Sequence, residues 1–418
     1  MLETCLTGRG KCPSRTSPPA GIFECDFDAK AYGHHQSLLD LASREKSLRI
    51  KANELVRDPV QKSYARSHEQ SDIKGCPGRN FSRKVTHAGA NGNVLLTTIS
   101  NIGDSFGRLS DSIVGSVVTV PTNLTTSIAD GFSEIQFILM SSDEGHSSCK
   151  VGDAPTLLKN ARFNESLPTA FFIHGYLDGQ DSESLIAVSG AFVRKGSHNI
   201  IAVDWSEYSG FPYLSAFSNL PGASRTIGDA LSRMVVAGLP AENIWLIGHS
   251  LGAQMTGVVA QNVDFRFQRI TGLDPAGPGF GIAGVASLTR DAAALVEVVH
   301  TDAGSLGTED ASGHIDIWPN KGKAVQPGCL FSVDEDTFCS HARAFIYLAE
   351  AVEHPDAFPA VRCASWNAFR RGECPVNGTN VVYLGYSQPD QNEPGNYFMN
   401  TNRAAPFGRG LQGVAVSA

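Results

Sequence analysis

Short apolar segments that alternate with helical stretches are the feature of this sequence that most limits its fold. After Gly131, five segments are short, apolar and rich in β-branched or aromatic residues, and each is bounded by Gly, Pro, Asp or Asn. They are residues 132–140, 169–175, 199–205, 243–250 and 296–301. Helical patterns lie between them, as at 224–239. This alternation predicts parallel strands joined by crossover helices, and therefore a doubly wound, mostly parallel α/β sheet, in which ligands bind beyond the carboxyl ends of the strands.

The overall charge argues against a nucleic-acid partner. The chain carries 34 Lys and Arg against 42 Asp and Glu, a formal charge of −8, and it has no basic block. Because nucleic-acid binders neutralise phosphates with clustered Lys and Arg, we exclude that class. Every long apolar run is interrupted by charge, Pro or amide side chains, so the sequence predicts no transmembrane segment.

The region before the α/β pattern has a different character. Residues 1 to about 90 are polar and show no sustained period, which predicts a poorly ordered extension. Residues 94–120 then carry apolar side chains at spacings of three and four, which predicts one amphipathic helix. Its apolar face could contact lipid or a partner, but packing on its own domain is the preferred interpretation. The expected organisation is an extension over 1–130 and an α/β domain over 131–410.

Cysteines and glycosylation sequons both suggest an oxidising, secretory environment. Cys329 and Cys339 bracket a short acidic loop, and Cys363 and Cys374 bracket another, so both pairs are candidate disulfides, with buried thiols as the alternative. The total of nine cysteines is odd, and the sequence leaves open the pairing of Cys5, Cys12, Cys25, Cys76 and Cys149. Sequons begin at Asn80, Asn123, Asn164 and Asn377, of which the last three are the glycosylation candidates.

The beginning of the chain does not fit this environment. Its first thirty residues lack the continuous apolar segment of a secretory signal. We nevertheless expect an extracellular protein.

Two segments match the pattern G-x-S-x-G of a nucleophilic serine, around Ser105 and Ser250. Such a serine needs a strand before it, a strained turn that exposes its hydroxyl, and a helix of small residues after it. Ser250 follows the apolar segment 244–247 and precedes the small residues 253–257, whereas Ser105 lies within the amphipathic period. Ser250 is therefore the predicted nucleophile, and Ser105 is a chance match.

A serine nucleophile needs a histidine base and a carboxylate that orients the base. Asp274 follows an expected strand over 269–273, with Asp302 and Asp316 as rivals for the acid. His341 begins an expected helix over 342–352 and competes with two other histidines for the role of base. Those rivals are His300 and His314. Spacing alone does not separate the candidates.

Seven segments occur in an order that resembles the pancreatic-lipase family of secreted serine lipases and phospholipases, over about residues 132–407. They are FFIHGYLDG, VDWSEYS, IWLIGHSLGAQMTG, ITGLDPAGP, VVHTDAGSLG, GHIDIWPNKG and CSHARA. The chain looks most similar to the single-domain insect members. The resemblance implies an α/β-hydrolase fold and the triad Ser250, Asp274 and His341. It also implies an oxyanion hole made by the backbone amides of Tyr176 and Leu251.

The chain departs from the family pattern in three places. Only nine residues, LFSVDEDTF, separate Cys329 from Cys339, so the lid is short, and the covering loop between His300 and His314 is also short. Both features resemble members that cleave phospholipids at the sn-1 ester. Ser287, Thr289 and Ala292 stand where the family has calcium ligands, so no metal is expected, and no organic cofactor is needed. The chain ends soon after the lipase core, so we expect neither a carboxyl-terminal β-sandwich domain nor colipase.

The resulting hypothesis is a secreted serine esterase that hydrolyses fatty-acyl esters of lipids at an interface. Phospholipase A1 activity is favoured by the short lid, and a triacylglycerol lipase or galactolipase is the enzyme alternative. The alternative from another class is a non-catalytic, lipase-like yolk or lipid-carrier protein. Acyl chain length and oligomeric state are not determined by the sequence.

Overall fold

A computed structural model describes residues 129–142, 145–329, 338–387 and 393–415. The predicted extension, the predicted helix over 94–120, Ser105 and the Asn123 sequon lie outside these residues. The strands are β1 Gln136–Met140, β2 His146–Lys150, β3 Thr169–Ile173, β4 Asn199–Asp204, β5 Ile244–His249, β6 Phe267–Leu273, β7 Ala293–Val299, β8 Ile315–Pro319, β9 Pro359–Arg362, β10 Val381–Tyr383 and β11 Gly395–Met399.

The helices connect these strands in the alternating way that the sequence predicts. The α-helices are α5 Glu183–Lys195, α6 Ser206–Ser209, α7 Tyr213–Val236, α8 Leu251–Ala260, α9 Cys339–Glu353 and α10 Trp366–Arg370. Short 3-10 helices cover Ala129–Phe132, Val151–Lys159, Ala241–Asn243, Arg290–Ala292, Asn320–Gly322 and Gly410–Gly413.

All eleven strands of the described residues belong to one sheet. Its strand order is β10-β9-β11-β8-β7-β6-β5-β3-β4-β1-β2. The strands from β11 to β4 in this order are parallel to one another, whereas β9 and β10 at one edge and β1 and β2 at the other pair antiparallel. The mostly parallel sheet predicted from the sequence is thus confirmed, and each of the five apolar segments overlaps one strand, β1, β3, β4, β5 or β7. β1 differs from the expected parallel strand, because it pairs antiparallel with both β2 and β4.

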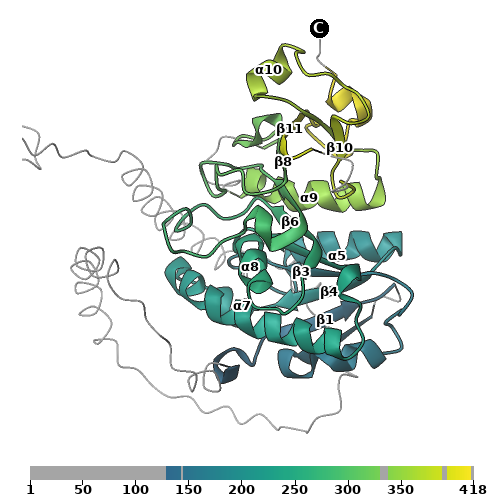
Figure 1. The fold of residues 1–418 in the computed structure, drawn as a ribbon, viewed down its shortest axis with the longest axis vertical. Coiled ribbons are helices and arrows are strands. Elements are labelled where there is room, and N and C mark those ends of the chain that lie inside the picture. Colours follow the sequence, from purple (N-terminus) through teal and green to yellow (C-terminus); the bar gives the residue numbers. More distant parts are fainter. Residues whose placement is uncertain (1–128, 143–144, 330–337, 388–392, 416–418) are drawn as a thin grey trace, which may run out of the picture.

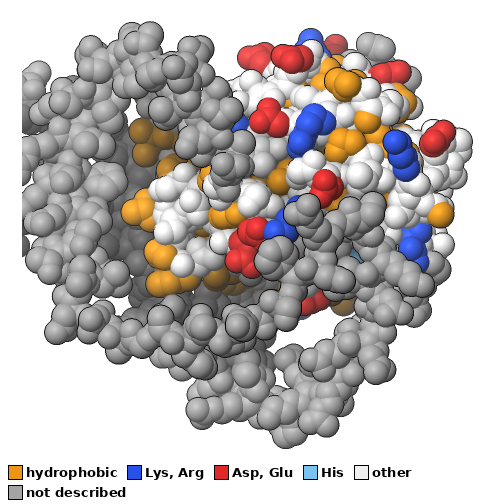
Figure 2. All heavy atoms as spheres, turned by 90° about the horizontal axis from the view of Figure 1, so that it is seen from below, with side chains coloured by type: hydrophobic (Ala, Val, Ile, Leu, Met, Phe, Trp, Pro, Cys, Tyr) orange, Lys and Arg blue, Asp and Glu red, His pale blue; other side chains and the backbone are white. Residues whose placement is uncertain are grey.

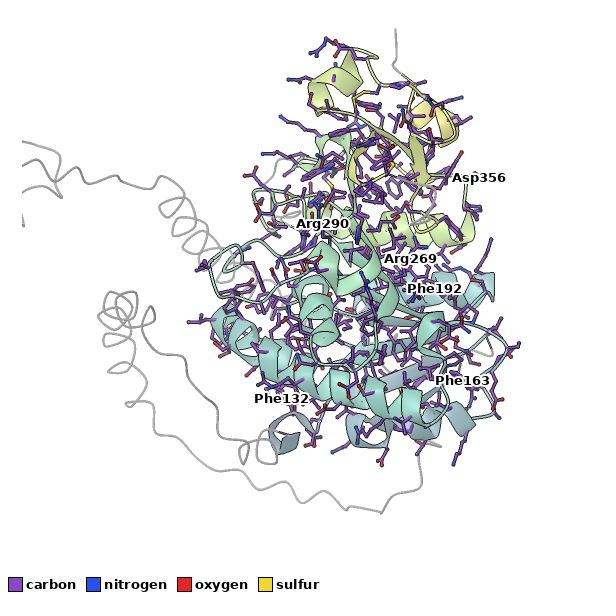
Figure 3. All side chains as sticks on the ribbon, in the orientation of Figure 1. Phe132, Phe163, Phe192, Arg269, Arg290 and Asp356 are labelled. Atoms are coloured by element: carbon purple, nitrogen blue, oxygen red, sulfur yellow. A yellow bond between two sulfur atoms is a disulfide. The ribbon has the colours of Figure 1, made fainter. Side chains whose placement is uncertain are left out.

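Helices cover both faces of the sheet, and the sheet separates two hydrophobic cores. Apolar side chains of α7 and α8 pack on one face, and those of α5 and α9 pack on the other (Figure 1). Parallel strands buried on both faces are continuous apolar runs, and every residue of β3, β4 and β5 is buried. In Figure 3, Phe192 of α5 and Arg269 of β6 lie in the middle of the molecule, where both contact Trp245.

Both disulfides expected from the sequence are formed. Cys329 pairs with Cys339, and Cys363 pairs with Cys374. Most of the predicted lid, residues 330–337, lies outside the described residues. Cys149 is buried on β2.

The surface combines both signs of charge with apolar side chains. On the face shown in Figure 2, Lys and Arg side chains are interspersed with Asp and Glu over the described part. Asn164 and Asn377 are exposed, as glycosylation would require. No helix in the described ranges is long and apolar enough to cross a membrane.

Candidate active site

Ser250 occupies a strained turn between β5 and α8. Its backbone has φ 57° and ψ −121°, a conformation that L-residues rarely adopt. Two glycines allow the close packing around it, because a Cβ on Gly248 would lie 2.2 Å from the carbonyl oxygen of Gly252, and one on Gly252 would lie 2.2 Å from that of Ile173. The strand, turn and small-residue helix predicted around Ser250 are all present.

Asp274 is held next to this turn by the backbone. It directly follows β6, the neighbour of β5 in the sheet, and is fully buried. The Ser250 amide donates to the Leu273 carbonyl at 3.0 Å, and the Ala276 amide donates to the Ser250 carbonyl at 3.1 Å. Because these bonds join the ends of two adjacent strands, the acid and the serine have a fixed relative position.

His341 reaches the same edge from the first turn of α9. Its Nδ1 lies 2.5 Å from Asp274 Oδ2, and both side chains are buried. Burial disfavours the charged imidazole, but the hydrogen bond and the charge of Asp274 outweigh that effect and raise the pKa of His341. A bond from Nδ1 to a carboxylate leaves Nε2 for proton transfer, which is the arrangement of a general base.

The second oxygen of Asp274 is bound by backbone amides that follow β7. The amides of Thr301 and Asp302 donate to Asp274 Oδ1 at 2.7 and 3.0 Å. The carboxylate is therefore fixed by three hydrogen bonds, in the orientation that directs its other oxygen to His341.

The rival candidates have other partners. His300 Nε2 lies 2.9 Å from Asp316 Oδ1, and the His300 ring stacks on Trp318. His314 Nδ1 accepts from the Val296 amide at 3.1 Å. Of the three candidate bases, only His341 contacts Asp274 within the described residues.

Asp302, the remaining rival for the acid, lies near both members of this pair. Its carboxylate lies within 4.8 Å of the acid group of Asp274 and of a ring nitrogen of His341. Burial and the charge of Asp274 raise the pKa of Asp302 to about 6.

The histidine that precedes the serine lies beside the candidate base. The ring centroids of His249 and His341 are 4.6 Å apart, and His249 Nε2 lies 3.3 Å from the His341 carbonyl oxygen. The hydroxyl of Ser250 makes no hydrogen bond to another described residue. Such contacts often tighten only when substrate binds, so the open hydroxyl is compatible with a nucleophile.

The predicted oxyanion amides flank this serine. Leu251 is the first residue of α8, so its amide has no partner carbonyl within that helix. Tyr176 lies in the turn after β3, and its ring packs against Tyr213 with centroids 5.2 Å apart. A Cβ on Gly175 would lie 2.8 Å from the Ser250 Cβ, which places this turn directly against the serine. His174 is buried next to this turn, where its Nε2 lies 3.2 Å from Asp204 Oδ1 and accepts from the Trp205 amide at 3.1 Å.

Among the described residues, only the cluster of Asp274, Asp302 and His341 has side-chain atoms close enough together to hold a metal ion. The segment with Ser287, Thr289 and Ala292 packs against α8, where Gln254 accepts from the Leu288 amide at 3.0 Å. The expectation that this segment binds no calcium remains a prediction.

A mostly parallel sheet with a strained serine turn after β5 and a buried acid after β6 defines an α/β-hydrolase. Sequence comparison specifies the group within this class. The model of the lipase family matches residues 100–407, so the chain belongs to the lipase family.

Relatives in this family are named for different activities. The chain is 29% identical to pancreatic triacylglycerol lipase of Sus scrofa over 68% of this chain and 69% of that protein. It is 35% identical to phospholipase A1 member A of Rattus norvegicus over 58% of this chain and 54% of the relative. It is also 30% identical to inactive pancreatic lipase-related protein 1 of Canis lupus familiaris over 63% of this chain and 62% of that protein. A solved phospholipase/carboxylesterase of Dyadobacter fermentans overlaps 32% of this chain and 66% of its own, at 16% identity and a TM-score of 0.26, which is too little to bear on function.

The sequence interpretation did not single out every residue at this site. Asp178 and the amide of Thr301 were not recognised, although both lie within the quoted segments FFIHGYLDG and VVHTDAGSLG. Backbone donors leave no signal in residue type, so only the fold could identify Thr301.

Proposed function

We propose that this protein hydrolyses fatty-acyl esters of lipids through an acyl-enzyme intermediate on Ser250. The observation that carries the proposal is the 2.5 Å contact between His341 and Asp274 at the sheet edge where the strained Ser250 turn lies. Membership of the lipase family supports the same chemistry. The chain matches only part of each relative, so the activity of the whole protein is also part of the proposal.

The proposed reaction has two stages. His341 Nε2 takes the proton from the Ser250 hydroxyl as its oxygen attacks the ester carbonyl, and Asp274 stabilises the imidazolium that forms. The amides of Tyr176 and Leu251 hold the negative oxygen of the tetrahedral intermediate, and such a donor typically contributes about 3 to 4 kcal/mol. His341 then protonates the leaving alcohol. Water, deprotonated by the same imidazole, releases the fatty acid from Ser250.

We further propose that the protein works outside the cell on phospholipids. The two disulfides favour an oxidising environment, and the exposed sequons at Asn164 and Asn377 are accessible to glycosylation. The short segment between Cys329 and Cys339 would leave the cleft open to a polar headgroup, which supports phospholipase A1 activity.

Reaction with an organophosphonate ester tests the nucleophile. We expect one adduct on Ser250, none in Ser250→Ala, and unchanged labelling in Ser105→Ala, the matched variant of the second G-x-S-x-G segment. His341→Ala should lower the labelling rate and ester turnover by roughly 10⁴-fold, because the hydroxyl then lacks its base. A folded wild-type protein without a Ser250 adduct would refute the proposal, and an unchanged rate in His341→Ala would move the base elsewhere.

A non-catalytic lipid carrier is the second candidate. The chain's similarity to an inactive pancreatic lipase-related protein is the observation that supports this second candidate. A carrier would bind a fluorescent fatty acid but would neither turn over an ester nor react with the phosphonate.

A further inference from the structure

Asp178 lies in the turn that links β3 to α5, two residues after the proposed oxyanion donor Tyr176. Its side chain is 25% exposed, so the carboxylate is partly shielded from water. The proposed mechanism does not use this group.

One oxygen of Asp178 brings three parts of the site together. Oδ2 accepts a hydrogen bond from the Gly175 amide at 3.3 Å and one from the buried Ser184 hydroxyl of α5 at 2.9 Å. The same oxygen lies 3.8 Å from His249 Nδ1, a buried atom that has no hydrogen-bond partner in the described part of the chain. The carboxylate therefore links the turn of Tyr176 to α5 and to the residue before Ser250.

The charge of Asp178 lies one ring away from the candidate base. Burial would raise the pKa of Asp178, but His249, His174 and the Ser184 hydroxyl lower it to about 2, so the group is ionised in neutral solution. Burial, together with the charge of His341, lowers the pKa of His249. A neutral His249 ring thus separates an anion from His341, which is also faced by Asp274 and Asp302.

We propose that Asp178 is a positioning residue, whose carboxylate holds the Tyr176 turn against the Ser250 turn and places a negative charge behind the His249–His341 pair. The inference rests on the proposed function. A negative charge at this place favours the imidazolium that forms when His341 takes the serine proton, and the Gly175 bond keeps the proposed oxyanion amide in register with Ser250.

Two substitutions separate these effects. In Asp178→Asn, the amide oxygen can still accept from Gly175 and Ser184, so the turn keeps its shape and only the charge is lost. In Asp178→Ala, both the charge and the hydrogen bonds from Gly175 and Ser184 are lost. Asp181→Asn is the matched control, because it removes the same charge from an exposed position three residues away.

The measurements are kcat and KM for a soluble p-nitrophenyl ester from pH 5 to 9, the rate of Ser250 labelling by the phosphonate, and thermal unfolding. For Asp178→Asn we expect a several-fold fall in kcat, an unchanged KM, and an acidic limb that moves to lower pH by roughly half a unit, since the imidazolium loses a neighbouring anion. For Asp178→Ala we expect kcat to fall by about 10- to 100-fold, because an oxyanion donor is displaced. Asp181→Asn should match the wild type.

The inference is wrong if both Asp178 variants match Asp181→Asn, or if Asp178→Asn loses activity without a shift of the acidic limb. It is also wrong if Asp178→Asn fails to fold while Asp181→Asn folds, since the carboxylate of Asp178 would then serve stability and not catalysis. The wild type is labelled first, and absence of its Ser250 adduct would remove the proposed function and this inference with it. A labelled wild type with unaffected variants would remove only the inference.

Discussion

Two buried carboxylates, of Asp274 and Asp302, lie near the imidazole of His341, and they differ in their effect on the free energy of unfolding. Asp274 is bound by two amides and by His341. Asp302 accepts from the Leu306 amide at 3.2 Å, and its pKa is raised to about 6 by burial and by the charge of Asp274. Since the ordinary pKa of an aspartate carboxyl in an unfolded chain is 3.8, the folded state binds the proton of Asp302 more tightly.

The shift predicts a pH-dependent gain in stability for Asp302→Asn. Protonated Asp302 contributes stability below about pH 4, and that contribution is lost as the pH rises through 6. The neutral amide should therefore raise the free energy of unfolding by about 2 to 3 kcal/mol at pH 8 and by little below pH 4. Urea unfolding at pH 4, 6 and 8 measures this.

Asp310→Asn is the matched control, because Asp310 is exposed in the same loop. A gain for Asp302→Asn of equal size at every pH would show that titration of Asp302 is not its cause.

At the scale of elements, the close approach of α8 to β3 allows the serine turn to form. The two sit so near that a Cβ on Gly252 would meet backbone carbonyls of Ile173 and His174 at 2.2 and 2.5 Å. The backbone of β3 cannot move away from α8 without breaking its hydrogen bonds to β5. A side chain at Gly190 of α5 would meet only the end of Arg194, at 2.9 Å.

Gly252→Ala should therefore lower the free energy of unfolding by about 2 to 3 kcal/mol, as overpacking does. Gly190→Ala, the matched change, should leave stability equal or raise it by about 0.5 to 1 kcal/mol, because Ala favours the helix and Arg194 can turn away. Thermal and urea unfolding measure the stability of both variants against that of the wild type. Equal effects of the two substitutions would contradict the contact argument.

Helix α7 shows where local preference was overruled. The sequence predicts a helical stretch over 224–239, and an interior proline such as Pro221 disfavours a helix because it removes one helical hydrogen bond. The observed helix is Tyr213–Val236 and passes through Pro221. Tyr213, Ala216 and Leu220 are buried on its first turns, so packing on the sheet outweighs the lost bond.

The substrate range belongs to the scale of the whole molecule, because the proposed site combines residues from distant parts of the chain, with Asp274 after β6 and His341 on α9. Only nine residues separate Cys329 from Cys339, and we propose that so short a segment would offer little apolar surface to an oil droplet. We expect phosphatidylcholine vesicles to be hydrolysed faster than triolein emulsion, with a short-chain ester as the soluble reference.

Released fatty acid is the measurement, and Ser250→Ala is the control for each substrate. Faster hydrolysis of triolein would contradict the phospholipase assignment while leaving the esterase intact. No turnover of any of the three would favour the lipid carrier.

Sequence alone determined the parts of this protein that depend on near neighbours along the chain. Apolar runs bounded by turn residues predicted the parallel strands, and the glycines around Ser250 predicted its turn, because both follow from local backbone and side-chain preferences. Spacing did not decide which histidine joins Asp274; the family resemblance implied His341, and the tertiary structure brings its ring to the carboxylate. His300, His314 and His341 were equivalent by spacing, and the fold separates them: His300 follows the end of β7, His314 precedes the start of β8, and His341 lies in the first turn of α9 next to Asp274. Contacts between residues 67 positions apart depend on how the layers pack, and no local pattern records that packing.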